Sequence, residues 1–338
     1  MKRFYFQAIS FFLCLCFISA ISLKTVRAKG EKAVEGRAEC VIEQETGRVL
    51  YEVRGDTRLP MASTTKVVTA ITVLEHCPNI DEEITIPNTA VGIEGSSVYL
   101  KAEERYTVKD LLYGLMLRSG NDCAVALALH IAGSISGFSA KMNEIAQKAG
   151  ALNSRFENPH GLPCKNHYTT ARDLCYITRY AMQNQAFAEI VATEYYAPRQ
   201  WKNKNKMLQG YEGAIGVKTG YTQEAGRCLV SAAKRENMSV ICTVLNCRPM
   251  YERSAELLDD AFATYQKTLL LKKGMQFEVE GKRGTVTRDY YYPLSEGERA
   301  HLEIRTSPCF ALKNEKIIGQ FGIYLSKRLL FSGNLYKL

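Results

Sequence analysis

The sequence predicts an α+β fold, in which helices flank an antiparallel sheet, followed by a small C-terminal domain made of strands. Strand-like segments lie on both sides of a central block of helical segments, as expected when helices pack on a sheet built from both ends of the chain. Beyond residue 272, short strand-like segments alternate with glycine and proline. We therefore expect one main domain over residues 29–272 and a β-rich domain over residues 273–338.

The first 28 residues have the pattern of an export signal. Lys2 and Arg3 precede the uncharged stretch Phe4–Leu23, and Val26-Arg27-Ala28 offers small residues where a signal peptidase reads. We predict a signal peptide over residues 1–28, with cleavage after Ala28. The 20 uncharged residues are also long enough to span a bilayer, so an uncleaved anchor is the alternative. In either case the remainder of the chain is exported, and membrane attachment is expected only if the segment is kept.

Strands and helices of the main domain follow in turn. Residues 39–43 and 48–53 alternate around Thr46-Gly47, which predicts a β-hairpin. Helices are expected at residues 111–117, which follow a capping box at Thr107, at 124–132 and at about 170–182. Strands are expected at residues 214–217, 228–233 and 240–245, and a further helix at 254–271. In the β-rich domain the clearest strands are 276–279 and 316–325.

Composition and charge exclude nucleic acid as a partner. The 338-residue chain has a formal net charge of +9, but four basic residues and no acidic ones lie in the signal segment, which leaves 40 basic against 35 acidic residues. This excess is small and scattered, unlike the clustered basic surfaces that bind nucleic acids. The hydrophobic fraction of 46% is that of a globular protein.

Cysteine and histidine patterns predict no metal site and no cofactor. Nine of the 11 cysteines remain after removal of the signal segment, an odd number without a C-x-x-C pair, and most are expected to be buried apolar side chains. Only His160 and His167 are close in sequence among the histidines, and we interpret them as loop and surface residues. The signatures of α/β-hydrolases, zincins and dinucleotide-binding folds are absent.

A serine and a lysine lie three residues apart in Ser63-Thr64-Thr65-Lys66. On a helix the two side chains share one face within reach of a hydrogen bond, whereas on a strand they face opposite ways. The uncharged run 67–74 is rich in β-branched residues and by propensity fits either structure. If it is a buried helix, desolvation lowers the pKa of Lys66, so that its amine can act as a base near neutral pH. A second S-x-x-K, residues 231–234, lies in a strand-like segment that would separate its two groups.

Two further triplets complete a recognisable set. Ser119-Gly120-Asn121 lies between two helical runs that would hold its hydroxyl and carboxamide rigidly. Lys218-Thr219-Gly220 follows a glycine-containing strand, along whose edge a peptide could lie while Lys218 and Thr219 hold its anionic end. Each triplet alone is an ordinary turn. Together with the S-x-x-K motif, in this order, they form the set of penicillin-interacting serine enzymes.

On these motifs the chain resembles the low-molecular-mass penicillin-binding proteins of the serine peptidase S11 family, the D-alanyl-D-alanine carboxypeptidases, whose fold is that of β-lactamases and transpeptidases. The resemblance covers about residues 38–270 and is looser in the β-rich tail. Further segments that carry it are 46–51, 95–100, 111–121, 158–162 and 216–222.

The resemblance implies a reaction on peptidoglycan stem pentapeptides and acylation by β-lactam antibiotics. Ser63 would attack the carbonyl between the two terminal D-alanines, Lys66 would take the serine proton, and Ser119 would pass a proton to the departing D-alanine. Water would then release the shortened peptide from the acyl-enzyme.

The same resemblance implies the substrate contacts. Asn121 would hold the acyl side, and Lys218 with Thr219 would bind the terminal carboxylate. The backbone N–H of Ser63 and the one after Gly220, that of Tyr221, would form the oxyanion hole. Some family members have histidine at the position of Tyr221, and many end in an amphipathic membrane helix, whereas residues 322–338 read here as strand and loop.

Other interpretations remain open from the sequence. A β-lactamase of the same fold would need a carboxylate to activate water, and Glu157 is the candidate, although it runs into a segment typical of the carboxypeptidases. A non-catalytic protein that binds the cell wall is the alternative from another functional class. Arg253 is either a positive charge near the substrate carboxylate or a solvated residue at a helix cap.

Overall fold

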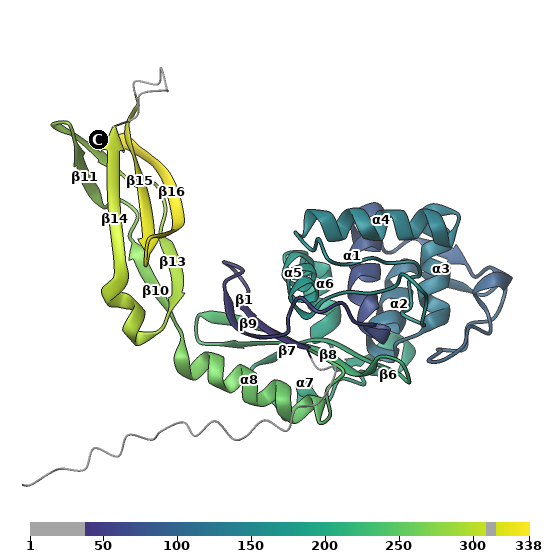
Figure 1. Cartoon of the computed structure of the whole chain (residues 1–338). Helices are drawn as coiled ribbons and strands as arrows, with labels where there is room; N and C mark the ends of the chain where they lie inside the picture. The colour runs from purple at the N-terminus through teal and green to yellow at the C-terminus, as the bar shows by residue number, and fades with distance from the viewer. Residues whose placement is uncertain (1–37, 309–315) are drawn as a thin grey trace, which may run out of the picture. The chain divides into compact units, whose positions relative to one another are not determined.

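The computed structural model describes residues 38–308 and 316–338 (Figure 1). The predicted signal peptide lies outside the described residues, as do Cys14, Cys16 and Cys309. Within the described part of the chain, no single helix is long and apolar enough to span a membrane, and one bent pair of consecutive helices, 121–132 with 135–148, passes the same test of length and composition only as a pair.

A five-stranded antiparallel sheet forms the centre of the main domain, in the order β2-β1-β9-β8-β7. Its strands are β1 (Ala38–Glu43), β2 (Val49–Val53), β7 (Ala214–Thr222), β8 (Gly226–Arg235) and β9 (Met238–Leu245). The predicted hairpin and all three predicted strands are confirmed. Strand β1 pairs with both β2 and β9, so the start of the chain joins strands from far along the sequence. Strand β7 lies at one edge of this sheet.

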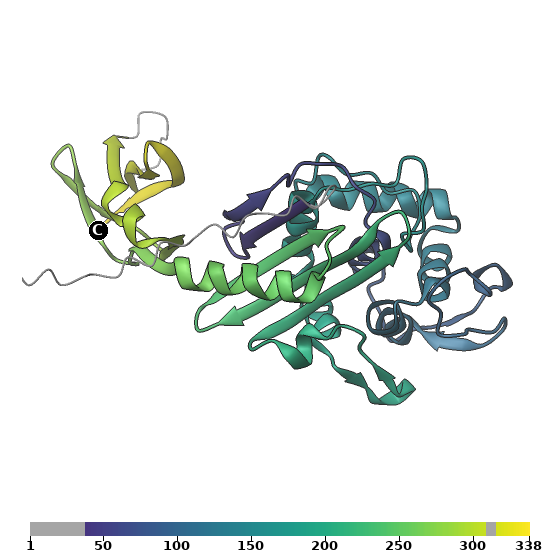
Figure 2. The same cartoon turned by 60° about the horizontal axis from the view of Figure 1, so that its bottom comes forward.

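Helices cover both faces of the sheet, which confirms the predicted fold class (Figures 1 and 2). They are α1 (Lys66–His76), α2 (Val108–Tyr113), α3 (Asn121–Ala132), α4 (Ile135–Lys148), α5 (Ala171–Ala181), α6 (Gln185–Ala192), α7 (Met207–Gly210) and α8 (Met250–Thr264). Because side chains alternate along a strand, Cys40 and Ile42 of β1 join the core under α1 and α5, whereas Val41 joins the core under α8.

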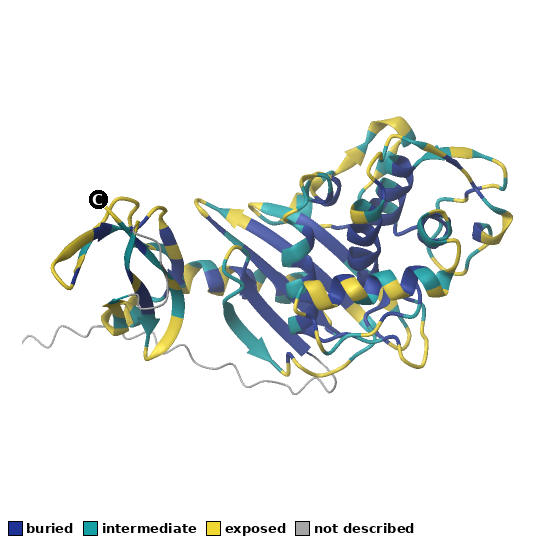
Figure 3. Cartoon of the chain, turned by 90° about the horizontal axis from the view of Figure 1, so that it is seen from above, coloured by how far each residue is buried: buried dark blue, intermediate teal, exposed yellow. Residues whose placement is uncertain are grey.

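Helix α1 is largely enclosed. Its first eight residues, from Lys66 to Val73, are all buried (Figure 3), and the helix packs among α3, α4, α5 and α6. A helix that carries no charge between Lys66 and Glu75 can bury all of its sides, so the run that fitted either helix or strand by propensity forms a core helix.

The remaining regular elements are short. They are β3 (Glu83–Thr85), β4 (Arg105–Thr107), β5 (Tyr195–Tyr196), β6 (Trp201–Lys202), three-residue 3-10 turns at Asn88–Ala90 and Ala197–Arg199, and a π-helical turn, Gly114–Arg118, that continues α2. Thr107 caps α2 by accepting a hydrogen bond from the Asp110 N–H at 2.9 Å, as its sequence position predicts.

The prediction of a helix over residues 254–271 is wrong in its last part. Helix α8 begins at Met250 and ends at Thr264, and residues 266–271 form strand β10, which pairs with β13 (Tyr290–Leu294). The segment Gln266–Leu271 has three polar residues followed by three leucines and is too short to show a helical period, so pairing with a partner strand decides its structure.

Past β10 the described chain consists mainly of strands, as predicted. A second five-stranded sheet has the order β11-β12-β16-β15-β14. Its strands are β11 (Gln276–Val279), β12 (Lys282–Thr285), β14 (Leu302–Pro308), β15 (Ile317–Leu325) and β16 (Arg328–Lys337), with a 3-10 turn at Glu296–His301. A separate apolar cluster that includes Leu271, Tyr290 and Phe321 holds these strands together. The division of the chain at residue 272 stays a prediction.

Candidate active site

Ser63 and Lys66 lie at the start of helix α1. Ser63 is in the 3-10 turn Ala62–Thr65, and Lys66 is the first residue of the helix that follows directly. The turn carries both side chains to one side, so the Lys66 Nζ atom lies 2.9 Å from the Ser63 Oγ atom. Ser63 is partly exposed, whereas Lys66 is completely buried. A substrate can therefore reach the hydroxyl while the amine stays out of water.

Lys66 has two further partners, and both can only accept hydrogen bonds. Its Nζ atom lies 2.6 Å from the Asn121 Oδ1 atom and 2.8 Å from the backbone carbonyl oxygen of His160. A neutral amine has two hydrogens and one lone pair. Because the two oxygens must receive the two hydrogens, the lone pair is directed at the Ser63 hydroxyl, the one partner of the three that can donate.

The environment of Lys66 favours the neutral amine. Burial lowers the pKa of Lys66 well below its ordinary value of 10.5, and the positive charge of Lys218 lowers it further. The sequence-based expectation for this side chain is confirmed in direction. A lysine of this kind can accept a proton near neutral pH.

The loop after α4 closes over the Ser63 turn. The Gly161 Cα atom approaches Ala62 so closely that a Cβ atom there would lie 1.9 Å from the Ala62 carbonyl oxygen, and its φ of +91° also favours glycine. The same approach brings the His160 carbonyl to Lys66. Ala62 itself has a φ of +50°, a left-handed conformation that is strained for alanine and that occurs often at functional sites.

Asn121 begins helix α3 and belongs to the same site. Its carboxamide is buried, with Oδ1 accepting from Lys66 and Nδ2 donating to the Glu94 carbonyl. An amide nitrogen has a second hydrogen, which is the one that a substrate carbonyl can use. In addition to the predicted substrate contact, Asn121 therefore orients the Lys66 amine.

Ser119 lies two residues earlier, in the tight connection between the π-helical turn and α3. It has a φ of +65° and is largely buried. The Gly120 N–H donates to the Gly114 carbonyl at 3.1 Å, so the connection is fixed by its own backbone. The predicted place of the triplet between two helical segments is confirmed, whereas the rigidity of the connection and the proton-transfer role of Ser119 stay predictions.

Asp122 fixes the loop that faces Asn121, a function that the sequence analysis missed. Its Oδ2 atom accepts hydrogen bonds from the Ser97 hydroxyl at 2.6 Å and from the Val98 and Leu100 N–H groups at 3.0 and 3.1 Å. The Asn121 N–H donates to the Ser96 carbonyl at 2.7 Å.

The triplet Lys218-Thr219-Gly220 lies on strand β7, which runs beside the Ser63 turn. A Cβ atom on Gly220 would lie 3.0 Å from the Met61 carbonyl oxygen and 3.1 Å from the Ser63 backbone nitrogen, so only glycine allows this approach without a shift. The structure thus brings the third motif against the first. Thr219 is half-buried and Tyr221 is exposed.

Lys218 is buried beneath this strand. Its Nζ atom donates to the Thr219 carbonyl at 3.0 Å, and burial, followed by the charge of Lys204, lowers its pKa to about 7. Lys204 was also missed by the sequence analysis. Its Nζ atom lies 3.4 Å from the Ser96 Oγ atom, and its charge also contributes to the lowered pKa of Lys66. Three amines thus act on one another electrostatically at this site.

His160 and His167 both lie outside helices and strands, as predicted, but His167 is buried and His160 is only partly exposed. Burial lowers the pKa of His160 to about 3 and that of His167 to about 4. The Thr65 hydroxyl donates to the Ala62 carbonyl, so it accepts from His167 Nε2 at 2.9 Å, while His167 Nδ1 accepts from the Glu157 N–H. His167 is therefore a neutral side chain that supports the Ser63 turn.

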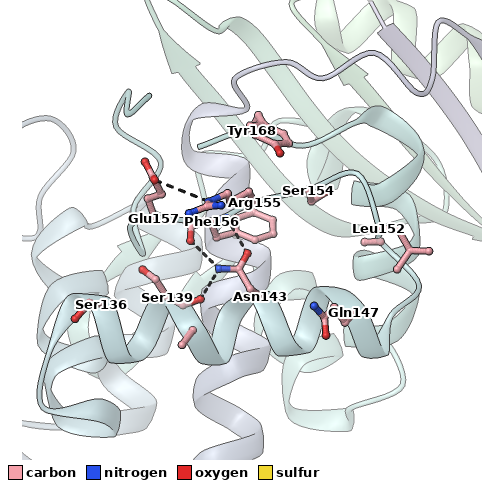
Figure 4. A pocket seen from close by; sticks show the side chains of 12 residues that line it. Ser136, Ser139, Asn143, Gln147, Leu152, Ser154, Arg155, Phe156, Glu157 and Tyr168 are labelled. Carbon is pink, nitrogen blue, oxygen red and sulfur yellow. Dashed lines mark hydrogen bonds and ion pairs between the residues drawn. The ribbon is translucent and has the colours of Figure 1, made fainter. Parts of the chain in front are cut away.

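Glu157 does not face Ser63. Its carboxylate accepts hydrogen bonds from the Asn166 side chain and backbone at 3.0 and 3.1 Å and from the Cys164 thiol at 2.7 Å. It also lines a cavity of about 730 Å³ between α4 and residues 151–157 (Figure 4), where it pairs with Arg155 at 4.0 Å. None of the candidate catalytic residues lines this cavity.

Arg253 and the cysteines contribute to the interior rather than to this site. The Arg253 guanidinium forms an ion pair with buried Glu39, with nitrogen–oxygen distances of 3.0 and 2.8 Å, which agrees with neither of the two roles considered from the sequence. Among the described residues the predicted burial of cysteine is confirmed at every position except Cys164.

Comparison with known proteins agrees with these features. The family model for D-alanyl-D-alanine carboxypeptidases, peptidase S11, matches residues 24–248. The chain belongs to this family.

Relatives within the family extend the match to most of the chain. The D-alanyl-D-alanine carboxypeptidase DacF of Bacillus subtilis is 33% identical over 281 residues, which make up 79% of this chain and 72% of that protein. Penicillin-binding protein 5 of Haemophilus influenzae has a similar solved structure, with a TM-score of 0.76 and 26% identity over 89% of this chain and 96% of that chain. A structure of the Streptomyces K15 DD-transpeptidase has a TM-score of 0.62 and 37% identity, over 67% of this chain and 97% of that chain.

Proposed function

We propose that the protein is a serine-type D-Ala-D-Ala carboxypeptidase that removes the terminal D-alanine from peptidoglycan stem pentapeptides through an acyl-enzyme on Ser63. The observation that carries this proposal is the hydrogen-bond set of the buried Lys66 amine. Two of its three partners can only accept, so its lone pair faces the Ser63 hydroxyl, 2.9 Å away. A binding protein has no use for a neutral amine aimed at an accessible hydroxyl.

In the first step, the Ser63 oxygen attacks the carbonyl carbon of the penultimate D-alanine while its proton moves to Lys66. The negative charge on the carbonyl oxygen is met by the N–H groups of Ser63 and Tyr221. Donors of this kind are each worth about 3 kcal/mol of transition-state stabilisation. The close approach of Gly220 to the Ser63 nitrogen supports this assignment.

Collapse of the tetrahedral intermediate breaks the bond to the terminal D-alanine. Ser119 donates its proton to the departing amine and is reprotonated from Lys66, which returns Lys66 to the neutral state. Water then attacks the ester on Ser63, and the shortened peptide leaves with a carboxylate. These steps restore both hydroxyls and the amine.

Strand β7 suits an extended peptide that ends in a carboxylate. It is an edge strand of its sheet, so a peptide can pair with its outer side by β-augmentation. Lys218 and Thr219 would bind the terminal carboxylate, and Asn121 would bind the acyl side through its second amide hydrogen.

The substrate determines where the enzyme acts. Peptidoglycan lies outside the cytoplasmic membrane, and the family works on this polymer, so extracytoplasmic action follows. We propose export through residues 1–28, with attachment to the membrane only if this segment is kept.

Incubation with penicillin tests the proposal against a β-lactamase. We expect a long-lived covalent adduct on Ser63 that is absent in Ser63→Ala and present in Ser231→Ala, which removes the serine of the second S-x-x-K motif. Rapid turnover of penicillin would favour the β-lactamase. The hydrogen bonds that engage Glu157 with Cys164 and Asn166 argue against that outcome.

Release of D-alanine tests the proposal against a non-catalytic wall-binding protein. A peptide ending in D-Ala-D-Ala should lose one D-alanine with the wild-type protein and none with Ser63→Ala. If a folded, penicillin-reactive sample released no D-alanine, the carboxypeptidase proposal would fail. Addition of an acceptor amine in the same assay measures transpeptidation, the activity named for the Streptomyces K15 relative.

A further inference from the structure

Three side chains of types that can bind metals lie close together at the end of helix α1 that is opposite Ser63. The ligand atoms of Cys77, Glu82 and His130 all lie within 4.8 Å of one another. The His130 Nε2 atom is 2.8 Å from the Glu82 Oε1 atom, and the Cys77 Sγ atom is 3.3 Å from the same oxygen. The carbonyl oxygen of Asn79 also lies 3.3 Å from this sulfur.

These separations are near those of ligands that share a zinc ion. With zinc–ligand distances of roughly 2.0–2.3 Å and tetrahedral angles, neighbouring ligand atoms are about 3.3–3.6 Å apart. The two measured separations, 2.8 and 3.3 Å, require only a small opening of the cluster. Thiolate, imidazole and carboxylate are the three ligand types that zinc uses in proteins.

Each of the three residues lies in a helix or directly beside a helix or strand. Cys77 ends helix α1, with its N–H donating to the Val73 carbonyl at 2.8 Å. Glu82 closes a turn through a hydrogen bond to the Asn79 carbonyl, and its own carbonyl accepts from the Val108 N–H at 3.0 Å. His130 lies in the last turn of α3. A site on rigid elements loses little entropy when it binds a metal.

We propose that Cys77, Glu82 and His130 bind one Zn²⁺ ion as a structural site, with water or the Asn79 carbonyl as the fourth ligand. Thiolate is the ligand form of cysteine, so binding releases the Cys77 proton to solvent.

The two helices joined by this site are those that carry the candidate catalytic groups. Helix α1 begins at Lys66 and α3 begins at Asn121, and both end at the cluster. The 11 residues of α1 separate the two sites by about 16 Å. The metal would therefore stabilise the arrangement of the helices and take no part in the reaction at Ser63.

The test is a zinc titration of the full chain after removal of metal with a chelator. We expect one zinc per chain, measured against a chromogenic competitor. At free zinc about 100 times the Kd, the Tm should rise by roughly 5–10 °C. Loss of a residue that only supports a metal ligand weakens metal binding about 10–100-fold. Glu82→Gln and His130→Gln remove ligands themselves, so each should weaken zinc binding by more than this.

Neighbouring residues of the same kind serve as controls. Glu83→Gln and His76→Gln change a glutamate and a histidine adjacent to the ligands in sequence and should leave zinc affinity unchanged. Glu83 is exposed and Glu82 is partly exposed, so neither Glu82→Gln nor Glu83→Gln should disturb folding. Equal penicillin acylation in all variants verifies the fold.

Either of two results overturns the proposal. In the first, the wild-type protein binds less than one zinc per chain in the titration. In the second, binding is stoichiometric but unaffected by Glu82→Gln and His130→Gln, which would assign the metal to another site. Neither result bears on the carboxypeptidase activity, which depends on Ser63.

Discussion

Replacement of Lys218 by methionine should stabilise the fold and, at the same time, prevent binding of the substrate carboxylate. Lys218 is 2% exposed, and its pKa falls from 10.5 to about 7 on burial. At pH 7 the unfolded chain therefore binds one proton at this site and the folded chain about half a proton. This pKa shift lowers the free energy of unfolding at pH 7 by about 4 kcal/mol.

Methionine has a similar volume and no charge, so Lys218→Met removes this cost. The change also deletes the hydrogen bond to the Thr219 carbonyl, which costs about 1–3 kcal/mol when the acceptor stays buried. The net gain is about 1–3 kcal/mol at pH 7, or roughly 3–10 °C in Tm. Most substitutions of buried residues destabilise proteins, so a gain is diagnostic.

The pH dependence has a definite sign. A lysine whose pKa is lowered on folding penalises the folded state fully below the folded pKa, and the penalty disappears as pH rises toward the unfolded pKa. The stability gain of Lys218→Met over wild type should therefore be widest at and below pH 7 and fall as pH rises toward 10.5, where the lost hydrogen bond leaves the variant less stable than wild type. Thermal unfolding followed by circular dichroism at pH 7 and pH 10 measures both values.

Lys202→Met is the matched control, because this lysine is exposed and should change stability by no more than about 0.5 kcal/mol. Isothermal titration in buffers of different ionisation enthalpy adds an independent measurement. A bound carboxylate should draw about half a proton into the wild-type site at pH 7 and none into Lys218→Met. A variant less stable than wild type at pH 7, or a gap that is equally wide at pH 10, would refute the reasoning.

Three further outcomes are expected. Gly220→Ala should slow acylation by penicillin about 10²–10³-fold, because the added Cβ atom forces β7 away from the oxyanion hole. The control is Gly210→Ala, which should be acylated normally because its Cβ atom would meet no atom within 4 Å. Asn121→Asp should raise the pKa of Lys66, because it places a carboxylate 2.6 Å from the Lys66 amine. The acylation rate at pH 7 should therefore fall and recover at higher pH. A pH profile of acylation identical to that of wild type would contradict this prediction. Asp122→Asn should increase amide hydrogen exchange in the loop it anchors and lower the acylation rate about tenfold, and unchanged exchange would show that the loop is held by other contacts.

The sequence was sufficient for the parts of the fold that depend on local pattern. The hairpin β1-β2 follows from alternation and a turn. The uncharged run after Lys66 fitted helix or strand by propensity, and a helix was expected there only because the chemistry of Ser63 and Lys66 requires one. The convergence of three distant motifs was inferred from their joint occurrence. The 2.6 Å contact between Lys66 and Asn121 and the approach of Gly220 to Ser63 bear out that part of the inference.

Features that depend on tertiary packing could not be predicted in this way. Residues 266–271 form a strand because β13 pairs with them, and a six-residue segment is too short for its periodicity to distinguish a strand from a helix end. His167 is buried because the loop after α4 folds back on the Ser63 turn. Lys204 lies in a polar segment that matches no sequence motif. Its contribution to the charge of the site follows only from the position of its side chain near Ser96.

The proposed zinc ligands show the same limit. The sequence prediction of no metal site was based on histidines close in sequence and on C-x-x-C pairs. Cys77, Glu82 and His130 form no known spacing, because 48 residues separate Glu82 from His130. They come together only because α1 and α3 end beside each other.

The burial of α1 has a consequence for how such an enzyme can evolve. Its first residue, Lys66, contacts Ser63, and the residues that follow belong to the hydrophobic core. A mutation that changes the site by altering these residues would also create a void or a clash in the interior, and selection would remove it for misfolding before its chemistry mattered. Mutations that give new substrate specificity or antibiotic resistance are therefore expected in the peripheral loops, where side chains can change without destabilising the fold.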